Sequence, residues 1–364
     1  MTKLQVKVDF TDQIIYVGLD IHLKSWHVTI YFGQRLQKSF RQDPCPKKLA
    51  NFLKENYPGA KYKCAYESGF SGFWVQRQLA KLGIECIIVN AADVPQTNKG
   101  MHFKTDKVDS KRIGVALESG MLQSIYIPDS EQESDRHLVR CNERLGRDLT
   151  RCKQRIKSML YQIGIAIPQE FNNGSWSNKF VQWLKDYKLE NNSSRRTLDH
   201  YLQIMFNIHQ EKQNTLKDIR QMLKQEHYSN LVKLLRSVCG VGQMTAITLT
   251  TEIIDMRRFR TFDALNCYIG FCPNEYTSGE KQRKGHMSFR LHKRLRSLLI
   301  EDAWIAIRHD PALSYCFYKS KMRLGEKRAI IVIARKLLGR IRAVWLSGKP
   351  YEKGIISQGE SINN

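Results

Sequence analysis

Acidic residues are scarce in this sequence, with 35 Asp and Glu against 59 Lys and Arg in 364 residues, and the formal net charge is +24. An excess of this size goes far beyond what solubility requires. It argues against a protein that handles cationic or neutral partners alone. The simplest explanation is a polyanionic partner, and nucleic acid is the commonest polyanion.

The sequence also lacks an uninterrupted apolar stretch of membrane-spanning length. Its best apolar run, Ile330 to Leu346, is broken by four basic residues, Arg335, Lys336, Arg340 and Arg342. A membrane surface is the rival explanation for the positive charge, but the sequence shows neither a signal peptide nor a spanning segment. We therefore expect no membrane association and a nucleoid-associated place in a prokaryotic cytoplasm.

No Cys-x-x-Cys pair occurs among the nine cysteines, which are odd in number and scattered in spacing. The sequence thus indicates neither a zinc site nor a disulfide framework. Most of these cysteines are interpreted as small buried residues in a reducing compartment.

The chain is long enough for two or three domains, and 42% of its residues are hydrophobic, which suffices for folded cores. Residues 10–128 alternate between strand and helix patterns, which predicts an α/β sheet with helices on its faces. The expected strands are 14–20, 26–32, 61–67 and 84–90, with the first two as a hairpin. The expected helices are 46–57, 70–82 and 107–122.

The pattern changes to long amphipathic helices in residues 129–230, predicted over 131–167 and 195–237 with a loop at 171–180. This region is interpreted either as a packed helical linker or as a coiled-coil arm that joins subunits. Residues 231–350 are predicted to form a mostly helical, basic C-terminal domain, and residues 351–364 a frayed tail.

Four carboxylates occur at the ends of predicted elements in the first domain. Asp20 and Glu67 each end a strand, and Asp106 and Asp109 begin a helix on one helical face. Carboxylates from separate elements can converge on hard divalent cations, Mg²⁺ above all and Mn²⁺ as a substitute. Two such ions would clamp the attacking and leaving oxygens of a phosphoryl transfer.

Each of these acids alone is explained as well by a helix cap, a helix-dipole effect or a turn. Their combined order along the chain is more specific and resembles an RNase H-like fold in its RuvC variant. Basic residues surround the acids and are candidate phosphate contacts, although each one alone could be a solvated surface charge. These are Lys24, Lys99, Lys104, Lys107, Lys111 and Arg112.

A glycine turn, Gly240-Val241-Gly242, opens a predicted helix at Gln243. It resembles a helix-hairpin-helix turn, in which backbone N–H groups bind a DNA phosphate, and a packing turn is the alternative. Farther on, residues 281–296 contain no acid, and this block predicts a polyanion-binding surface. Its basic residues are Lys281, Arg283, Lys284, Arg290, Lys293, Arg294 and Arg296.

Ser278 lies just before this block, in Tyr276-Thr277-Ser278-Gly279. From the residues alone it is a turn serine, since no neighbouring group would activate it as a nucleophile.

The order of these motifs resembles the DEDD transposases of insertion sequences, a family that includes Piv/MooV-like DNA invertases and bridge-RNA-guided recombinases. The resemblance covers residues 14–346. It rests on Gly18-Leu19-Asp20, Glu67-Ser68, Asp106-x-x-Asp109, the glycine turn, and Tyr276 to Gly279 followed by a basic helix that ends in Leu295–Leu299 and Ala303-Trp304.

The resemblance implies that Asp20, Glu67, Asp106 and Asp109 hold Mg²⁺ and that Ser278 attacks DNA to form a phosphoserine link. It further implies a dimer to tetramer in which acids and serine come from one or different protomers. A structured noncoding bridge RNA would select donor and target DNA by base pairing.

One departure from the family pattern concerns residues 286–292, where no glycine follows Gly285. Ser288 thereby becomes a rival nucleophile, and Tyr276 a more remote one. Two other functions remain open. One is a structure-selective endonuclease whose metal ions activate water, and the other is a nucleic-acid-binding protein without catalytic activity.

Overall fold

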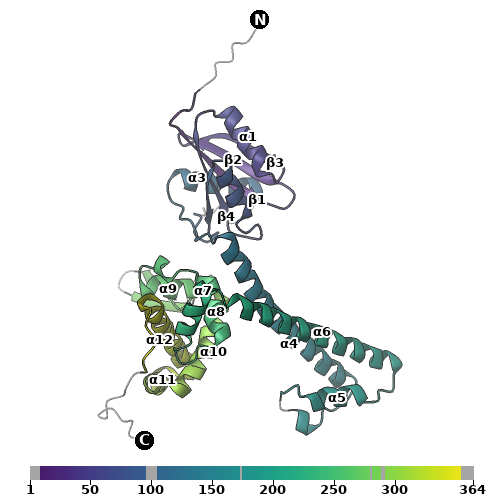
Figure 1. The fold of residues 1–364 in the computed structure, drawn as a ribbon. Helices are drawn as coiled ribbons and strands as arrows, with labels where there is room; N and C mark the ends of the chain where they lie inside the picture. Colours follow the sequence, from purple (N-terminus) through teal and green to yellow (C-terminus); the bar gives the residue numbers. More distant parts are fainter. Residues whose placement is uncertain (1–8, 96–104, 173, 279–280, 288–291, 354–364) are drawn as a thin grey trace, which may run out of the picture. The chain divides into compact units, whose positions relative to one another are not determined.

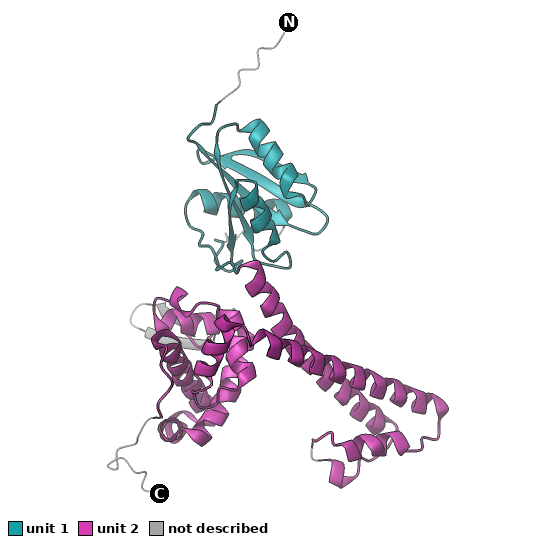
Figure 2. Cartoon of the chain, viewed as in Figure 1, with its two compact units in different colours: residues 1–128 teal, residues 129–364 magenta. Residues whose placement is uncertain are grey.

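A computed structural model describes residues 9–95, 105–172, 174–278, 281–287 and 292–353. The chain divides into two compact units, residues 1–128 and residues 129–364 (Figure 2). Each unit has its own hydrophobic core, and each is considered separately below. None of the helices formed by the described residues is both long enough and apolar enough to cross a membrane.

The first unit is built on a five-stranded sheet in the order β3-β2-β1-β4-β5 (Figure 1). Its strands are β1 (Ile14–Ile21), β2 (Trp26–Phe32), β3 (Arg35–Gln42), β4 (Lys61–Glu67) and β5 (Glu85–Val89). The first three pair antiparallel, whereas β1, β4 and β5 run parallel. This mixed sheet confirms the predicted α/β unit and is consistent with an RNase H-like start.

Strand periodicity decides which residues face which layer of helices. Along β1, the side chains of Ile15, Val17 and Leu19 are buried in a core shared with the helices α1 (Pro46–Asn56) and α2 (Trp74–Lys81). The alternate residues Gly18 and Asp20 therefore point to the opposite face. That face is covered by α3 (Asp106–Glu118), so Asp20 lies on the same side of the sheet as the predicted Asp106 and Asp109.

Strand β3 was not expected from the sequence. Its residues are mostly exposed and lack an alternating apolar pattern, because it is an edge strand that pairs only with β2. The link between β2 and β3 is the two-residue turn Gly33-Gln34, with φ angles of 58° and 59°. Two positive φ angles at this position match a type I′ hairpin turn.

The other elements of the first unit confirm the prediction to within a few residues. The largest differences are of about four residues: α2 begins at Trp74 and not at Phe70, and α3 ends at Glu118 and not at Leu122. Helix α3 begins at Asp106 because the Thr105 hydroxyl accepts a hydrogen bond from the Val108 N–H. Asp106 is therefore not the cap of its helix, which removes one of the structural explanations for this acid.

The second unit opens with two long helices that lie side by side, α4 (Ser130–Gln162) and α6 (Asn192–Met222) (Figure 1). Asp129 and Gln132 form a capping box at the start of α4. The helices run antiparallel, since Asn142 donates to Thr215 while Cys152 contacts the Tyr201 carbonyl. A helical hairpin is thus confirmed, while coiled-coil packing and subunit joining remain predictions.

Between these helices, the chain forms η1 (Gln169–Phe171) and α5 (Asn178–Asp186). The predicted loop over 171–180 is wrong at both ends, since Phe171 closes η1 and residues 178–180 begin α5. The segment packs into a small core with the hairpin, in which Phe180 and Leu184 are fully buried. The predicted helix over 195–237 is also divided, because α6 ends at Met222 and α7 (Glu226–Leu235) follows.

The remaining chain is mostly helical and forms the largest core. It contains α8 (Gln243–Ile253), η2 (Met256–Arg258), α9 (Phe262–Ile269), α10 (Lys293–His309), α11 (Pro311–Leu324) and α12 (Glu326–Ser347). A two-stranded antiparallel hairpin interrupts the helices, β6 (Pro273–Ser278) and β7 (Lys281–Met287). The expected turn and basic helix are therefore wrong for residues 273–278 and 281–287, which form strands.

Candidate active site

Gly18 brings the acids together because it allows β1 and α3 to touch through their backbones. A Cβ atom at this position would lie 2.0 Å from the Ser110 carbonyl oxygen and 2.4 Å from the Gly114 nitrogen. No larger residue fits such an approach. Thr29 on β2 and Ser110 on α3 are joined by a buried hydroxyl hydrogen bond of 2.8 Å beside it.

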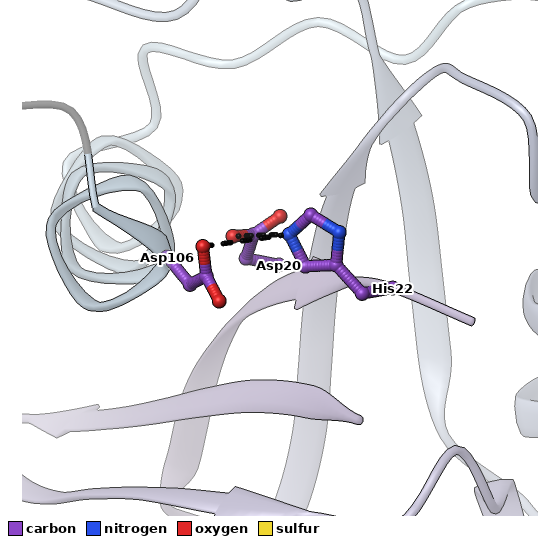
Figure 3. A group of neighbouring side chains, drawn as sticks. All are labelled: Asp20, His22 and Asp106. Atoms are coloured by element: carbon purple, nitrogen blue, oxygen red, sulfur yellow. Dashed lines mark hydrogen bonds and ion pairs between the residues drawn. The ribbon is translucent and has the colours of Figure 1, made fainter. Parts of the chain in front are cut away.

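Asp20 and Asp106 converge around His22, a residue that sequence reasoning missed (Figure 3). The His22 Nε2 atom lies 3.2 Å from Asp20 Oδ2 and 3.6 Å from Asp106 Oδ1. One ligand atom from each of the three residues lies within 4.8 Å of the others, close enough to share a cation. The sequence did contain a signal for His22. It follows Asp20 by two residues, a spacing that places both side chains on one face of an extended chain.

The other two predicted acids, Glu67 and Asp109, meet at Arg112. The Arg112 Nη2 atom lies 3.1 Å from Glu67 Oε1 and 3.3 Å from Asp109 Oδ1. The Asp109 side chain is buried, and its Oδ1 atom has no hydrogen-bond partner in the described part of the chain. Its burial is offset by the positive charge of the Arg112 guanidinium, which forms an ion pair with this same oxygen.

The electrostatics of Asp20 show that the acids act on one another. Burial raises the pKa of Asp20 above its ordinary value, and His22 opposes that shift. The carboxylates of Asp106 and Asp109 raise this pKa further, since like charges disfavour a second ionised group nearby. The four predicted acids therefore occupy one side of the sheet, as two neighbouring groups linked through α3.

Basic residues surround the acids at short range. Arg41 on β3 forms an ion pair of 3.2 Å with Asp106. Arg41, Lys107 and Lys111 all lower the pKa of His27, after the larger effect of burial, so these three cations lie near the same face. Lys24 is exposed just after β1. Two further predicted phosphate contacts, Lys99 and Lys104, lie outside the described residues.

The two glycines of the predicted DNA-binding turn have different surroundings. Gly240 has a φ of +90°, and a Cβ there would lie 2.5 Å from the Asp302 carbonyl oxygen on α10. Gly242 is the N-cap of α8 and is exposed, and a Cβ added there would meet nothing within 4 Å. Close packing against α10 thus explains the glycine at position 240, whereas Gly242 leaves open space at the start of α8.

Ser278 is the last residue of β6 and pairs with Lys281 at the start of β7. Lys281, Arg283 and Lys284 lie along β7, so the basic block is divided between a strand and a helix. Arg290 lies outside the described residues, as does Ser288. Ser278 belongs to residues 129–364, while the four acids belong to residues 1–128.

A buried carboxylate on α8, Glu252, forms the centre of a cluster that the sequence did not reveal. It is 1% exposed and accepts two hydrogen bonds of 2.7 Å from Arg140. Arg294 also bonds to it, and His292 Nε2 lies 3.2 Å away. Burial alone would raise the pKa of Glu252, but the hydrogen bonds and charges of Arg140 and His292 hold it well below its ordinary value.

The partners of Glu252 come from α4 and α10, and Arg140 is 112 residues away in sequence. No local spacing could have indicated this cluster. One predicted phosphate contact, Arg294, is thereby anchored inside the protein, while its neighbour Lys293 is exposed.

Comparison with known proteins places both halves of the chain among transposases. Residues 17–165 match the DEDD family model described as "Transposase", and residues 232–318 match the family described as "Transposase IS116/IS110/IS902 family". The first match contains all four acids and indicates a divalent metal. The second contains the glycine turn and Ser278.

Full-length similarity is found with the transposase of insertion sequence element IS1533 from Leptospira borgpetersenii. It is 23% identical over 350 residues, covering 94% of this chain and 99% of the relative. The transposase of element IS1111A from Coxiella burnetii is 23% identical over 256 residues, or 69% of each chain. A Sinorhizobium fredii relative whose name describes it as a transposase is 27% identical, and the match spans 69% of this chain but only 60% of that relative.

The acids that converge at β1 and α3 thus fall inside a matched DEDD domain, and the transposase segment follows it in the expected order. The chain belongs to the DEDD transposases of insertion sequences.

Proposed function

We propose that this chain cuts and rejoins DNA with the help of a divalent metal ion, Mg²⁺ or Mn²⁺, and through a covalent link to Ser278. The observation that carries the proposal is the convergence of Asp20 and Asp106 around His22, on the face of the sheet that also bears Glu67 and Asp109. In a chain of the DEDD transposase family, this is the place where a phosphodiester and a cation would meet.

The residues present fit a hard divalent cation. Asp20, Glu67, Asp106 and Asp109 would supply carboxylate oxygens, the ligands that Mg²⁺ prefers, and Arg112 and Arg41 offset the repulsion among them. His22 would orient Asp20 through its 3.2 Å contact and serve as a nitrogen ligand only for a softer ion. Such an ion would stabilise charge on the phosphodiester oxygens.

The Ser278 hydroxyl would attack the phosphorus atom, bond to it, and release the 3′ or 5′ oxygen of the cut strand. The phosphoserine bond would conserve the energy of the broken phosphodiester. A DNA hydroxyl would then attack this bond, restore a phosphodiester and release the serine. The acids and Ser278 come from different units of the chain, and we propose that a homodimer or homotetramer assembles them within or between protomers.

We further propose that a structured noncoding RNA guides the choice of donor and target DNA. The support is the family resemblance together with a net charge of +24, which suits polyanionic partners. Base pairing would then carry the sequence choice, and protein side chains would contact the backbone.

The serine assignment is tested by recombination of DNA with the element's own flanks, in wild type and in Ser278→Ala. We expect the variant to lose strand exchange while it still binds nucleic acid. Ser288→Ala is the matched control, since it removes the rival hydroxyl and should keep strand exchange. Unchanged recombination by Ser278→Ala would refute the assignment.

A structure-selective endonuclease is the second candidate. The observation in its favour is that all four acids lie within residues 1–128, without any need for Ser278. In that case metal-dependent cleavage of branched DNA would give free ends and no protein-linked product, and Ser278→Ala would cleave as well as wild type.

A further inference from the structure

A groove between α4, α6, α8 and α10 lies in the second unit. Its main hollow has a volume of about 660 Å³, and the groove continues into two smaller hollows through the shared residues Arg147, Arg151 and Arg294. Together their walls contain seven Arg and Lys residues and three acidic ones. The groove is therefore electropositive, and none of the acids of the first unit lines it.

Four arginines of α4 line the groove, and we name them the arginine ladder: Arg140, Arg144, Arg147 and Arg151. Their spacings of four, three and four residues place them on one face of the helix, over about 16 Å of its length. Arg144, Arg147 and Arg151 are exposed. Arg144 forms no ion pair with any residue in the described ranges, so its charge is available to a ligand.

Glu252 fixes one end of the ladder. It holds Arg140 through both carboxylate oxygens and holds Arg294 on the opposite wall, so two guanidinium groups are positioned before any ligand binds. Guanidinium groups recognise phosphate oxygens through paired hydrogen bonds. Arg136 is a third arginine beside this buried carboxylate, so the arginines outnumber it, and two of them, Arg140 and Arg294, line the hollows. Arg294 is shared with Glu143, a second carboxylate on the wall.

The acids along the walls are weak competitors for the ladder. Arg147 pairs with Glu143 at 3.0 Å and Arg151 with Asp148 at 3.1 Å, and both arginines are more than half exposed. Exposed pairs of this kind contribute little to stability, so a phosphate can replace Asp148 at Arg151 at low cost. Glu143 also pairs with Arg294, so it is the stronger competitor of the two. Lys212 and Lys293 on the other walls add charge without an ion pair among the described residues.

We propose that this groove binds the phosphate backbone of duplex DNA. The inference rests on the proposed function, since the walls formed by α8 and α10 belong to the segment that matches the IS116/IS110/IS902 transposases. A ladder that repeats along one helix suits a regular row of backbone phosphates, which positions DNA without reading its sequence.

The test measures binding of an unrelated 30-base-pair duplex by the full-length protein in EDTA, over a range of salt concentrations. The variant Arg144→Ala/Arg147→Ala should bind at least about tenfold more weakly at moderate salt. Its plot of log affinity against log salt should be less steep by about two, because each lost phosphate contact lowers the slope by about one.

The matched control is Arg196→Ala/Arg220→Ala, which removes the same charge from exposed positions of α6 outside the groove. It should change affinity by less than about threefold. Glu143→Gln removes a competing carboxylate and should strengthen binding. Circular dichroism and thermal unfolding establish that each variant is folded.

Equal losses in the ladder variant and the control would overturn the proposal, because general charge would then explain binding. A duplex RNA of the same sequence that binds more tightly than DNA, and depends on the ladder, would overturn the choice of DNA. Since the assay needs neither metal nor Ser278, failure of the proposed chemistry leaves this result unaffected, and the two failures can be told apart.

Discussion

The charged clusters of the two units differ in their ratio of acidic to basic residues. In the first unit, Asp20, Glu67, Asp106 and Asp109 share two arginines and one histidine. In the second unit, the buried Glu252 faces Arg136, Arg140, Arg294 and His292, and Glu143 is a second carboxylate beside Arg294. A surplus of carboxylate oxygens suits a cation, and a surplus of guanidinium groups suits a phosphate.

The comparison also separates the acids that we propose for chemistry from an acid that holds the fold together. Burial raises the pKa of Asp20, so its charged form is held at a cost that a metal ion would offset. Arg140 and His292 lower the pKa of Glu252, so its charged form is stabilised by the fold itself. Removal of the charge at Asp20 should therefore lower activity and leave stability nearly unchanged, whereas removal of the charge at Glu252 should lower stability.

The largest expected effect concerns Asp20. Asp20→Asn should lower metal-dependent DNA cleavage by about 10³-fold, because a charged oxygen ligand is lost from the site. Its unfolding temperature should stay within a few degrees of wild type, since burial already disfavours the carboxylate. Asp43→Asn, which changes an exposed acid of the same unit, is the control and should keep full activity. Full activity in Asp20→Asn would remove Asp20 from the site.

Glu252 should give the converse result. Glu252→Gln leaves its arginines without a buried counter-charge and should cost about 3–5 kcal/mol of unfolding free energy, measured by denaturant titration. Glu326→Gln breaks an exposed pair with Lys321 and should cost less than about 1 kcal/mol. Similar small losses in both variants would mean that the cluster does not hold α4, α8 and α10 together.

The glycine turn offers a sharper comparison within one motif. Gly240→Ala meets both a positive φ and the Asp302 carbonyl, and should destabilise the protein by about 3 kcal/mol. Gly242→Ala has ordinary dihedral angles and open space, so a change below about 1 kcal/mol is expected. Thermal unfolding compares them, and equal losses would contradict the packing role assigned to Gly240.

The smallest expected effect is a pH dependence from Asp302, which lies beneath the turn. Burial raises the pKa of Asp302 to about 7, and a hydrogen bond from Thr245 only partly opposes this. The folded state therefore binds this proton more tightly than the unfolded chain does. Its contribution to stability is complete below about pH 4 and is lost as the pH rises toward 7.

Asp302→Asn should remove that dependence. The free energy of unfolding of the variant, relative to wild type, should increase by about 1–3 kcal/mol between about pH 5 and about pH 8. Denaturant titrations at the two pH values measure the difference. A constant difference at both would show that Asp302 does not titrate in this range.

Much of the first unit was predictable because its strands alternate and its acids occur at element ends. Asp20 and Glu67 were predicted as ligands from their positions at strand ends, and Asp106 and Asp109 from the start of a helix. The structure brings all four to one side of the sheet, and their role as ligands stays a prediction. His22 shares that period with Asp20 and was available to the same reasoning. Strand β3 was missed because an exposed edge strand carries no apolar pattern.

The second unit was less predictable because its determinants are distant in sequence. Glu252 occurs within a run of threonines on α8, and its partners Arg140 and Arg294 are ordinary basic residues of other helices. The hairpin of β6 and β7 was missed because a lysine- and arginine-rich block is compatible with either a helix or a strand. Helix periodicity found α4 and α6 but could not locate the break after Met222.

Covalent trapping of DNA tests the central claim most directly. The full-length protein is incubated with its flanking DNA, guide RNA and Mg²⁺, stopped with denaturant, and examined for attached DNA by gel shift and peptide mapping. The account predicts an adduct that maps to Ser278, persists in Ser288→Ala, and is absent in Ser278→Ala and Asp20→Asn. Metal-dependent cleavage in wild type without any adduct would contradict it and would establish hydrolysis by activated water instead.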